Sequence, residues 1–261
     1  MIEAKNMQMN KTIFITGATS GFGKAIAEKF AAENWNCIIT GRRKEKLDEL
    51  ATALSSNKNI NVLPLAFDVS KKVEVFAAVN SLKDDWKNID VLVNNAGLAA
   101  GRDAFDEASL DDWDEMIDTN VKGLLYVSKA IIPLMIKNKK GHIINIGSTA
   151  AKEVYKDGNV YCASKFAVNA ISQSQRIDLL PHKIKVTCIN PGAAETEFSL
   201  VRFKGDEQKA KAVYEGYEPL HAEDIAGTLY YCATLPAHVC INDLVITSTA
   251  QANSFYTYKG Q

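Results

Sequence analysis

The sequence predicts an α/β fold with a doubly wound parallel sheet of about seven strands and helices on both faces. Short apolar, β-branched runs alternate with longer segments of helical periodicity. The short runs are apolar throughout, as expected of strands that helices cover on both sides. A glycine-rich turn follows the first run and opens the first helical segment. Sheets that bind dinucleotides place such a turn there, so the pattern favours nucleotide binding.

The expected strands and helices follow one another along the whole chain. Strands are expected at 12–16, 37–40, 62–67, 91–93, 142–146, 185–189 and 244–247. Helices are expected at about 21–33, 44–56, 71–86, 109–138, 158–180 and 222–234. This alternation implies right-handed crossovers between parallel strands, the arrangement called Rossmann-type.

Polar and proline residues mark several of the expected helix ends. Ser70 is expected to cap the third helix and Ser109 to open the long fourth helix, because a serine hydroxyl accepts hydrogen bonds from free N–H groups. Pro181 is expected to close the fifth helix. Residues 1–10 are polar and expected to be flexible, with no signal peptide or membrane span. No linker or repeat divides residues 1–261, so one domain is expected.

Composition excludes several classes of function. The 30 Lys and Arg residues nearly balance the 31 Asp and Glu residues, which argues against a nucleic-acid surface. The five cysteines are scattered without a Cys-x-x-Cys spacing, which is typical of reduced thiols in a cytoplasmic protein. The four histidines lack ligand spacing, so no metal site is predicted. No nucleic-acid partner is therefore expected.

The glycine-rich turn is the first candidate binding element. Glycine lets the backbone bend sharply and approach a phosphate without an intervening Cβ. The helix that follows directs free N–H groups and its positive dipole end to the same place. An ordinary strand-to-helix connection is the alternative. The residues that this turn assigns to the cofactor are Gly17, Thr19, Ser20, Gly21, Phe22 and Gly23.

Candidate contacts also follow the other expected strands, and ligands of such sheets lie beyond the carboxyl ends of the strands. Arg42 and Arg43 follow the second strand, where an acid would bind the ribose hydroxyl of NAD and arginine suits the 2′-phosphate of NADP. The sequence therefore predicts NADP. Asp68 is expected to contact adenine, with a plain turn residue as the alternative. Further expected contacts are Val69, Asn95, Ala96, Gly97, Pro191, Gly192, Ala194, Thr196 and Phe198, whereas Asn94 is expected to tie strands together.

Tyr161 and Lys165 form the candidate catalytic pair. On a helix, a spacing of four places the phenol and the ammonium on one face. The ammonium would lower the tyrosine pKa from about 10, so the phenol could exchange a proton with an alcohol or carbonyl. Ser148, at the end of the preceding strand, would hydrogen-bond the substrate oxygen. The alternative is two exposed helix residues beside a serine that caps a turn.

These motifs together resemble those of the short-chain dehydrogenase/reductases over nearly the whole chain. The resemblance matches TGATSGFG at 16–23 to the family's cofactor turn, although Phe22 replaces the usual aliphatic residue, and NNAG at 94–97 to its fourth-strand motif. It implies that Asn120, Ser148, Tyr161 and Lys165 form a catalytic tetrad. Lys165 would also grip the nicotinamide ribose, and Asn120 would hold a water that relays protons. The family's subunit contacts imply a homotetramer.

A narrower resemblance is to the NADP-dependent 3-hydroxy acid dehydrogenases, through TGRR at 40–43, GNVY at 158–161 and VRFKGD at 201–206. It implies oxidation of serine, L-allo-threonine or 3-hydroxypropionate, or the reverse reduction of malonic semialdehyde. The chain departs at 193–196, which is one residue shorter than in that branch. Residues 193–220 correspond to a substrate lid. Within it, Arg202 is the expected anchor for the substrate carboxylate, with a solvated loop arginine as the alternative.

Two other functions stay open at this stage. The same chemistry would serve another small ketone, aldehyde or sugar derivative, because the sequence does not reveal the shape of the pocket. A protein of another class, a dinucleotide-binding sensor without turnover, would share the cofactor turn. The intact tetrad favours an enzyme over the sensor.

Overall fold

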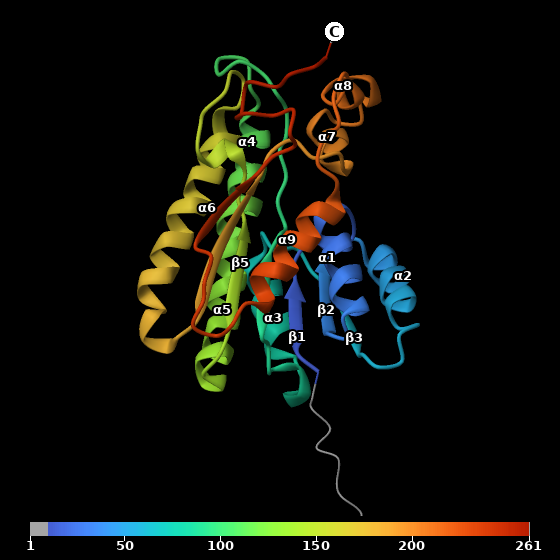
Figure 1. Ribbon diagram of the computed structural model, residues 1–261, viewed down its shortest axis with the longest axis vertical. Coiled ribbons are helices and arrows are strands. Elements are labelled where there is room, and N and C mark those ends of the chain that lie inside the picture. Colours follow the sequence, from blue (N-terminus) through green and yellow to red (C-terminus); the bar gives the residue numbers. More distant parts are fainter. Residues whose placement is uncertain (1–9, 261) are drawn as a thin grey trace, which may run out of the picture.

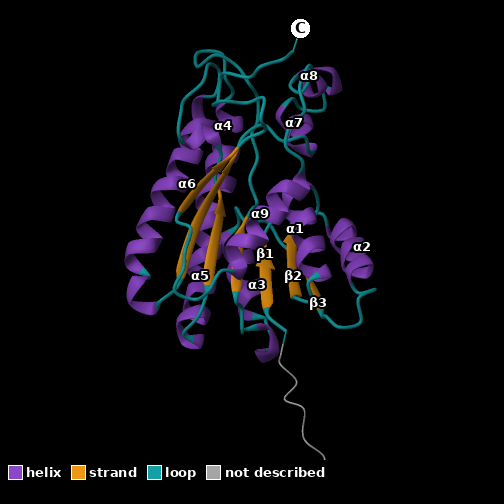
Figure 2. Cartoon of the chain, viewed as in Figure 1, coloured by secondary structure: helices purple, strands orange, loops and turns teal. Residues whose placement is uncertain are grey.

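The computed structural model describes residues 10–260, and its centre is a seven-stranded sheet with all strands parallel. The strand order is β3-β2-β1-β4-β5-β6-β7, with the reversal between β1 and β4. The strands are β1 Thr12–Ile15, β2 Asn36–Gly41, β3 Val62–Ala66, β4 Val91–Asn94, β5 His142–Ile146, β6 Lys185–Pro191 and β7 Asp243–Ile246. The predicted doubly wound fold is confirmed (Figures 1 and 2). The expected flexibility of residues 1–9 lies outside the described residues.

Helices cover both faces of this sheet (Figure 1). Helices α1 Gly21–Ala32, α2 Lys44–Leu54 and α9 Ala222–Thr234 pack on one face. Helices α3 Lys72–Asn80, α5 Leu124–Asn138 and α6 Asn159–Asp178 pack on the other. Helix α4 Leu110–Ile117 precedes α5, while α7 Glu197–Arg202 and α8 Glu207–Ala212 lie above the carboxyl edge of the sheet in Figure 1.

The apolar strands form a core on each face of the sheet. Ile13 and Ile15 of β1 pack against the α1 side, while Phe14 between them packs against the α3 and α5 side. All three side chains are fully buried. Burial of each such side chain contributes roughly 1.5–3 kcal/mol. The buried residues on both faces explain why the strands lack polar alternation.

A buried polar cluster links the central strands, as predicted for Asn94. The Asn94 amide nitrogen donates to Asn145 Oδ1 at 2.8 Å and to Ser128 Oγ at 3.0 Å. Asn145 in turn donates to Ser172 Oγ at 2.8 Å. Strands β4 and β5 are thereby fixed to helices α5 and α6. Asn94 Oδ1 is buried without a hydrogen-bond partner among residues 10–260, which offsets part of the stabilisation that these bonds give.

Several expected helix boundaries are wrong. Ser70 does not cap the third helix, because its N–H is held by Asp68 Oδ1 at 2.9 Å and the helix begins after Lys71. That helix ends at Asn80, and a separate 3-10 turn follows at Asp84–Trp86. Ser109 occupies the N-cap position, but its hydroxyl makes no capping hydrogen bond. The fifth expected helix ends at Asp178, before Pro181, as predicted.

The long fourth helix is not continuous. A π-helical turn, η2 Asp118–Gly123, separates α4 from α5. At its end Gly123 packs so closely on Val69 that a Cβ there would lie 2.8 Å from the valine side chain. Single π-turns within helices often occur at functional sites. This turn carries Asn120, one of the predicted site residues.

Candidate active site

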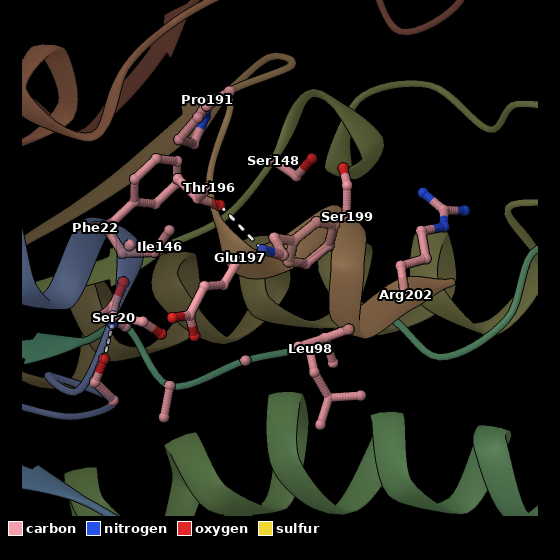
Figure 3. A pocket seen from close by; sticks show the side chains of 18 of the residues that line it. Ser20, Phe22, Leu98, Ile146, Ser148, Pro191, Thr196, Glu197, Ser199 and Arg202 are labelled. Atoms are coloured by element: carbon pink, nitrogen blue, oxygen red, sulfur yellow. Dashed lines mark hydrogen bonds between the residues drawn. The ribbon is translucent and has the colours of Figure 1, made fainter. Parts of the chain in front are cut away.

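The carboxyl ends of the strands surround a cleft of about 460 Å³, within the usual range for ligand pockets. Its lining includes every predicted site residue except Gly23 and Asn120. Figure 3 shows part of this lining, with Phe22 and Ser20 toward one end and Arg202 at the other. Residues that the sequence places far apart therefore meet at one site, as the strand-end pattern predicts.

The glycine turn has the conformation that its residues predict. Gly17 and Gly21 have φ of 68° and 49°, values that favour glycine. A Cβ on Gly17 would lie 2.9 Å from the Ala96 backbone, so the turn packs directly on the chain that follows β4. The turn and the free N–H groups of α1 form a cradle for a pyrophosphate. These residues fit a dinucleotide.

Gly23 has a packing role, and the cofactor contact predicted for it stays a prediction. A Cβ at this position would lie 2.3 Å from the carbonyl oxygen of Gly17. Gly23 thus allows helix α1 to pack against the turn and does not line the cleft. A close approach between helix and strand is a known role for the third glycine of such turns.

Two arginines make the end of the cleft beside β2 cationic. Arg43 donates to Thr19 Oγ1 at 2.8 Å and to Ser20 Oγ at 2.9 Å, which holds its guanidinium against the glycine turn. Arg42 lines the same end, with Nη1 3.8 Å from a carboxylate oxygen of Glu115. Asp68 borders the cleft after β3. The arginine pair at this end suits a phosphate group.

Ser148, Tyr161 and Lys165 meet at the middle of the cleft. Tyr161 and Lys165 lie on the buried face of α6, with exposed fractions of 8% and 6%. Lys165 Nζ donates to the Ile146 carbonyl at 3.0 Å and lies 5.9 Å from the centre of the Tyr161 ring. Ser148 follows β5 and lines the same cleft (Figure 3). The exposed-helix alternative for the pair is wrong.

Burial dominates the ionisation of this pair. It raises the pKa of Tyr161 above its usual value, and neighbouring Tyr155 adds to the rise. The Ser148 hydroxyl and the Arg202 charge only partly oppose that rise. Burial also lowers the pKa of Lys165 to about 8, because the dry surroundings disfavour the ammonium. The expected lowering of the Tyr161 pKa by Lys165 is therefore wrong for the protein chain itself.

Asn120 lies behind the wall of the cleft. Its side chain accepts from the Leu98 N–H and donates to the Leu98 carbonyl, both at 2.8 Å. It also donates to Ser164 Oγ at 3.0 Å. These contacts place Asn120 outside the lining of the cleft, and its predicted role in holding a proton-relaying water stays a prediction. Asn120 joins the loop after β4 to helix α6, which carries the catalytic pair.

Arg202 reaches the cleft from the end of α7. Its Nη1 donates to the Tyr155 hydroxyl at 3.0 Å, and its Cζ lies 5.5 Å from the centre of the Tyr161 ring. Its Nη2 is buried and has no hydrogen-bond partner among residues 10–260. A buried guanidinium N–H without a partner is costly. Arg202 is thus held against the cleft by protein contacts, so the solvated-loop alternative is wrong.

The cleft also contains residues that the sequence did not single out. Gln251 Oε1 accepts from the Ala193 N–H at 2.8 Å, and the Tyr214 hydroxyl donates to the Ala194 carbonyl at 2.8 Å. Gln251 could have been found from the sequence, because it follows β7 as the other candidate contacts follow the six earlier strands. Tyr214 lies in a segment without periodicity, so no pattern marked it. The missed lining residues include Tyr155, Ser199, Tyr214, Gln251 and Ser254.

Known proteins resemble this chain in sequence and structure. Residues 11–206 match the family model described as short chain dehydrogenase. An NADP-dependent 3-hydroxy acid dehydrogenase from Salmonella typhimurium is 46% identical over 241 residues, covering 92% of this chain and 96% of the relative. Sulfoacetaldehyde reductase 2 from Chromohalobacter salexigens is 43% identical over 249 residues, covering 95% and 98%. The closed form of a serine dehydrogenase complexed with NADP+ superposes with a TM-score of 0.89 at 43% identity, covering 96% and 100%.

Proposed function

The chain belongs to the short-chain dehydrogenase family, and on that premise we propose that it oxidises short 3-hydroxy acids at their 3-hydroxyl carbon. It is an NADP-dependent oxidoreductase that acts on CH–OH groups. The proposed substrates are serine, L-allo-threonine and 3-hydroxypropionate, with malonic semialdehyde reduced in reverse. The observation that carries this proposal is the buried, unpartnered Nη2 of Arg202 beside Tyr161.

The strand-end residues would divide the cofactor between them. The glycine turn and the N-terminus of α1 would take the pyrophosphate, with Arg42 and Arg43 at the 2′-phosphate. Asp68 and Val69 would border the adenine. The segment 95–97 and the residues Pro191, Gly192, Ala194, Thr196 and Phe198 would line the nicotinamide end, where Lys165 would hold the ribose. Bound NADP supplies the hydride acceptor, and NADPH supplies the donor.

Tyr161 is the proposed acid and base. Its raised pKa keeps the phenol protonated at neutral pH, which suits a proton donor to a carbonyl oxygen under reduction. In oxidation, Tyr161 would have to be in its phenolate form, the minor form at neutral pH, to accept the substrate hydroxyl proton, while the hydride from C3 would go to NADP. Ser148 would hydrogen-bond the reacting oxygen and hold it near the phenol. The Arg202 charge lowers the pKa of Tyr161, so an anchor for the substrate also assists proton transfer.

The lid would supply substrate selection. Residues 193–220 include α7, so the proposed carboxylate anchor Arg202 belongs to this segment. A planar guanidinium binds a carboxylate through two parallel hydrogen bonds. Tyr155, which accepts from Nη1, would fix the plane of the guanidinium. The acid's C3 oxygen would then reach Ser148 and Tyr161.

Replacing Arg202 with alanine should raise KM for L-serine about 10- to 100-fold, since a hydrogen bond to a charged group contributes roughly 1.5–3 kcal/mol. KM for a neutral ketone should change little, because a ketone has no anionic group for Arg202 to bind. Lys204→Ala is the matched control, because this lid lysine is exposed and pairs with Asp112 at 2.8 Å. Steady-state kinetics of both variants measure the effect. An unchanged KM for serine in Arg202→Ala would contradict the proposal that Arg202 binds the substrate carboxylate.

The test of the proposed function follows absorbance at 340 nm with L-serine, L-allo-threonine and 3-hydroxypropionate, each with NADP and with NAD. Strong reduction of NADP by these acids, and weak reduction of NAD, is the expected result. If the acids are inert and a neutral ketone oxidises NADPH, the hydroxy-acid proposal fails and the family membership stands. Binding of NADPH without any turnover would instead favour the sensor alternative.

An anionic aldehyde is the second candidate substrate. The relative named sulfoacetaldehyde reductase 2 aligns with 95% of this chain. A sulfonate presents oxygen acceptors to a guanidinium as a carboxylate does, so Arg202 would serve either group. Adding sulfoacetaldehyde to the NADPH assay distinguishes the two. A higher kcat/KM for the sulfonate than for malonic semialdehyde would favour this candidate.

We also propose a homotetramer in the cytoplasm. Apolar side chains on α6 and beyond its end remain exposed, including Ile177 at 72% and Leu180 at 73%, which supports subunit contacts there. All five cysteines are free thiols, and four are buried, which supports a reducing compartment. Among residues 10–260 no helix is long and apolar enough to cross a bilayer.

A further inference from the structure

Glu197 reaches from the lid to the cationic end of the cleft. It is the first residue of α7, and its carboxylate lies 3.0 Å from Arg43 Nη1 and 3.4 Å from Lys46 Nζ. Figure 3 shows its side chain directed toward Ser20, whereas Arg202 at the other end of α7 points away from it. Two ends of one short helix thus contact opposite parts of the cleft.

Four hydrogen bonds to three residues hold the guanidinium of Arg43 in one place. Thr19 and Ser20 fix one side, and Glu197 takes Nη1 on the other. Burial alone would raise the pKa of Glu197, but Arg43 and Lys46 together lower it below the usual range. The carboxylate is therefore charged at neutral pH. The Glu197 carboxylate is therefore already paired with Arg43 and Lys46, the cations that suit the phosphate on the ribose.

We propose that Glu197 is an internal anion that the 2′-phosphate of NADP must displace from Arg43 and Lys46. This inference rests on the proposed placement of the 2′-phosphate at Arg42 and Arg43. A phosphate and a carboxylate on the same guanidinium N–H groups compete for donors and repel each other. NAD carries a neutral hydroxyl there and leaves the Glu197 contacts in place. Glu197 therefore lowers the affinity for NADP and leaves that for NAD nearly unchanged.

The test measures the Kd of NADPH and of NADH by coenzyme fluorescence, without substrate. Glu197→Gln should bind NADPH about three- to tenfold more tightly, the range expected when half-exposed ion pairs stop competing, and NADH within twofold of wild type. The difference should shrink in 1 M salt, because salt screens exposed charges. Glu195→Gln is the matched control, since this exposed acid removes the same charge from the same segment. It should leave both affinities near wild type.

Three results would overturn the proposal. NADPH binding to Glu197→Gln could be unchanged or weaker, which would make Glu197 a support for Arg43 instead of a competitor. Glu197→Gln could bind both coenzymes more tightly by the same factor, or Glu195→Gln could bind NADPH as tightly as Glu197→Gln does. Either result would indicate a general effect of charge. Arg43→Met could bind NADPH as wild type does, which would show that the phosphate lies elsewhere. Hydroxy acids do not enter this assay, so these failures are distinct from failure of the substrate proposal.

Discussion

Replacing Tyr161 with phenylalanine is expected to lower kcat about 1000-fold while the Kd of NADPH stays within about threefold of wild type. General acid–base groups contribute typically 10²–10⁴-fold to rate. The ring should keep its position, because it packs against Phe198 with centroids 5.6 Å apart and needs no hydroxyl for that contact. Steady-state kinetics with NADP and 3-hydroxypropionate, and coenzyme fluorescence, measure the two quantities.

Tyr155→Phe is the matched control for that variant. Tyr155 is a second tyrosine in the same cleft, and its hydroxyl accepts from Arg202 Nη1 at 3.0 Å. Losing that contact should raise KM for the acid and leave kcat within about threefold. If Tyr161→Phe keeps more than a tenth of the wild-type kcat, another group must transfer the proton. If Tyr155→Phe loses as much kcat as Tyr161→Phe, the roles of the two tyrosines are wrongly assigned.

Replacing Lys165 with methionine is expected to lower kcat at least 100-fold and to stabilise the fold. Burial lowers the pKa of Lys165 to about 8 from 10.5, which corresponds to about 3 kcal/mol of destabilisation at neutral pH. Methionine fills similar space without charge. The substitution also removes the hydrogen bond from the ammonium to the Ile146 carbonyl, and this loss offsets about 1 kcal/mol of the stabilisation. The free energy of unfolding at pH 7 should therefore rise by about 2 kcal/mol.

The pH dependence of stability gives a second measure of Lys165. Below pH 8 the lysine is protonated in both states, so its contribution is constant. Between about pH 8 and 10.5 the unfolded chain binds more protons than the folded one, so wild-type stability should rise with pH. Urea unfolding of Lys165→Met should lack this rise, while the exposed-lysine control Lys72→Met should keep it. A loss of stability at pH 7 in Lys165→Met would show that the ammonium is well solvated or paired.

The parts of the fold that the sequence could predict rest on strong, local patterns. Runs such as that around Phe14 are apolar because both faces of the sheet are covered, and this signal is independent of distant contacts. Ligands of such sheets bind at the carboxyl ends of the strands, so the residues that follow each strand could be assigned to one cleft from the sequence alone. NADP was predicted because arginines, with no acid, follow β2, and the NADP-dependent relatives confirm it.

The remainder depended on contacts that have no local signature. Gly23 looks like a ligand-binding glycine, yet it is the carbonyl of Gly17 that excludes a Cβ. The break at η2 does not interrupt the apolar periodicity from which the long helix was inferred. Helices α7 and α8 have six residues each, which is too short for periodicity to reveal them. The raised pKa of Tyr161 follows from burial in the assembled cleft, and spacing along one helix cannot report that.

The most direct test of the central claim is the fate of deuterium on C3. The protein should oxidise 3-hydroxypropionate that carries two deuterium atoms at C3, with NADP, and the coenzyme is then examined by mass spectrometry. We expect one deuterium in each NADPH formed from the C3-deuterated acid, and none from acid labelled only at C2. Two results would contradict hydride transfer from C3 of the hydroxy acid. The C3-deuterated acid could yield NADPH without deuterium, or it could yield no NADPH although the protein reduces a neutral ketone.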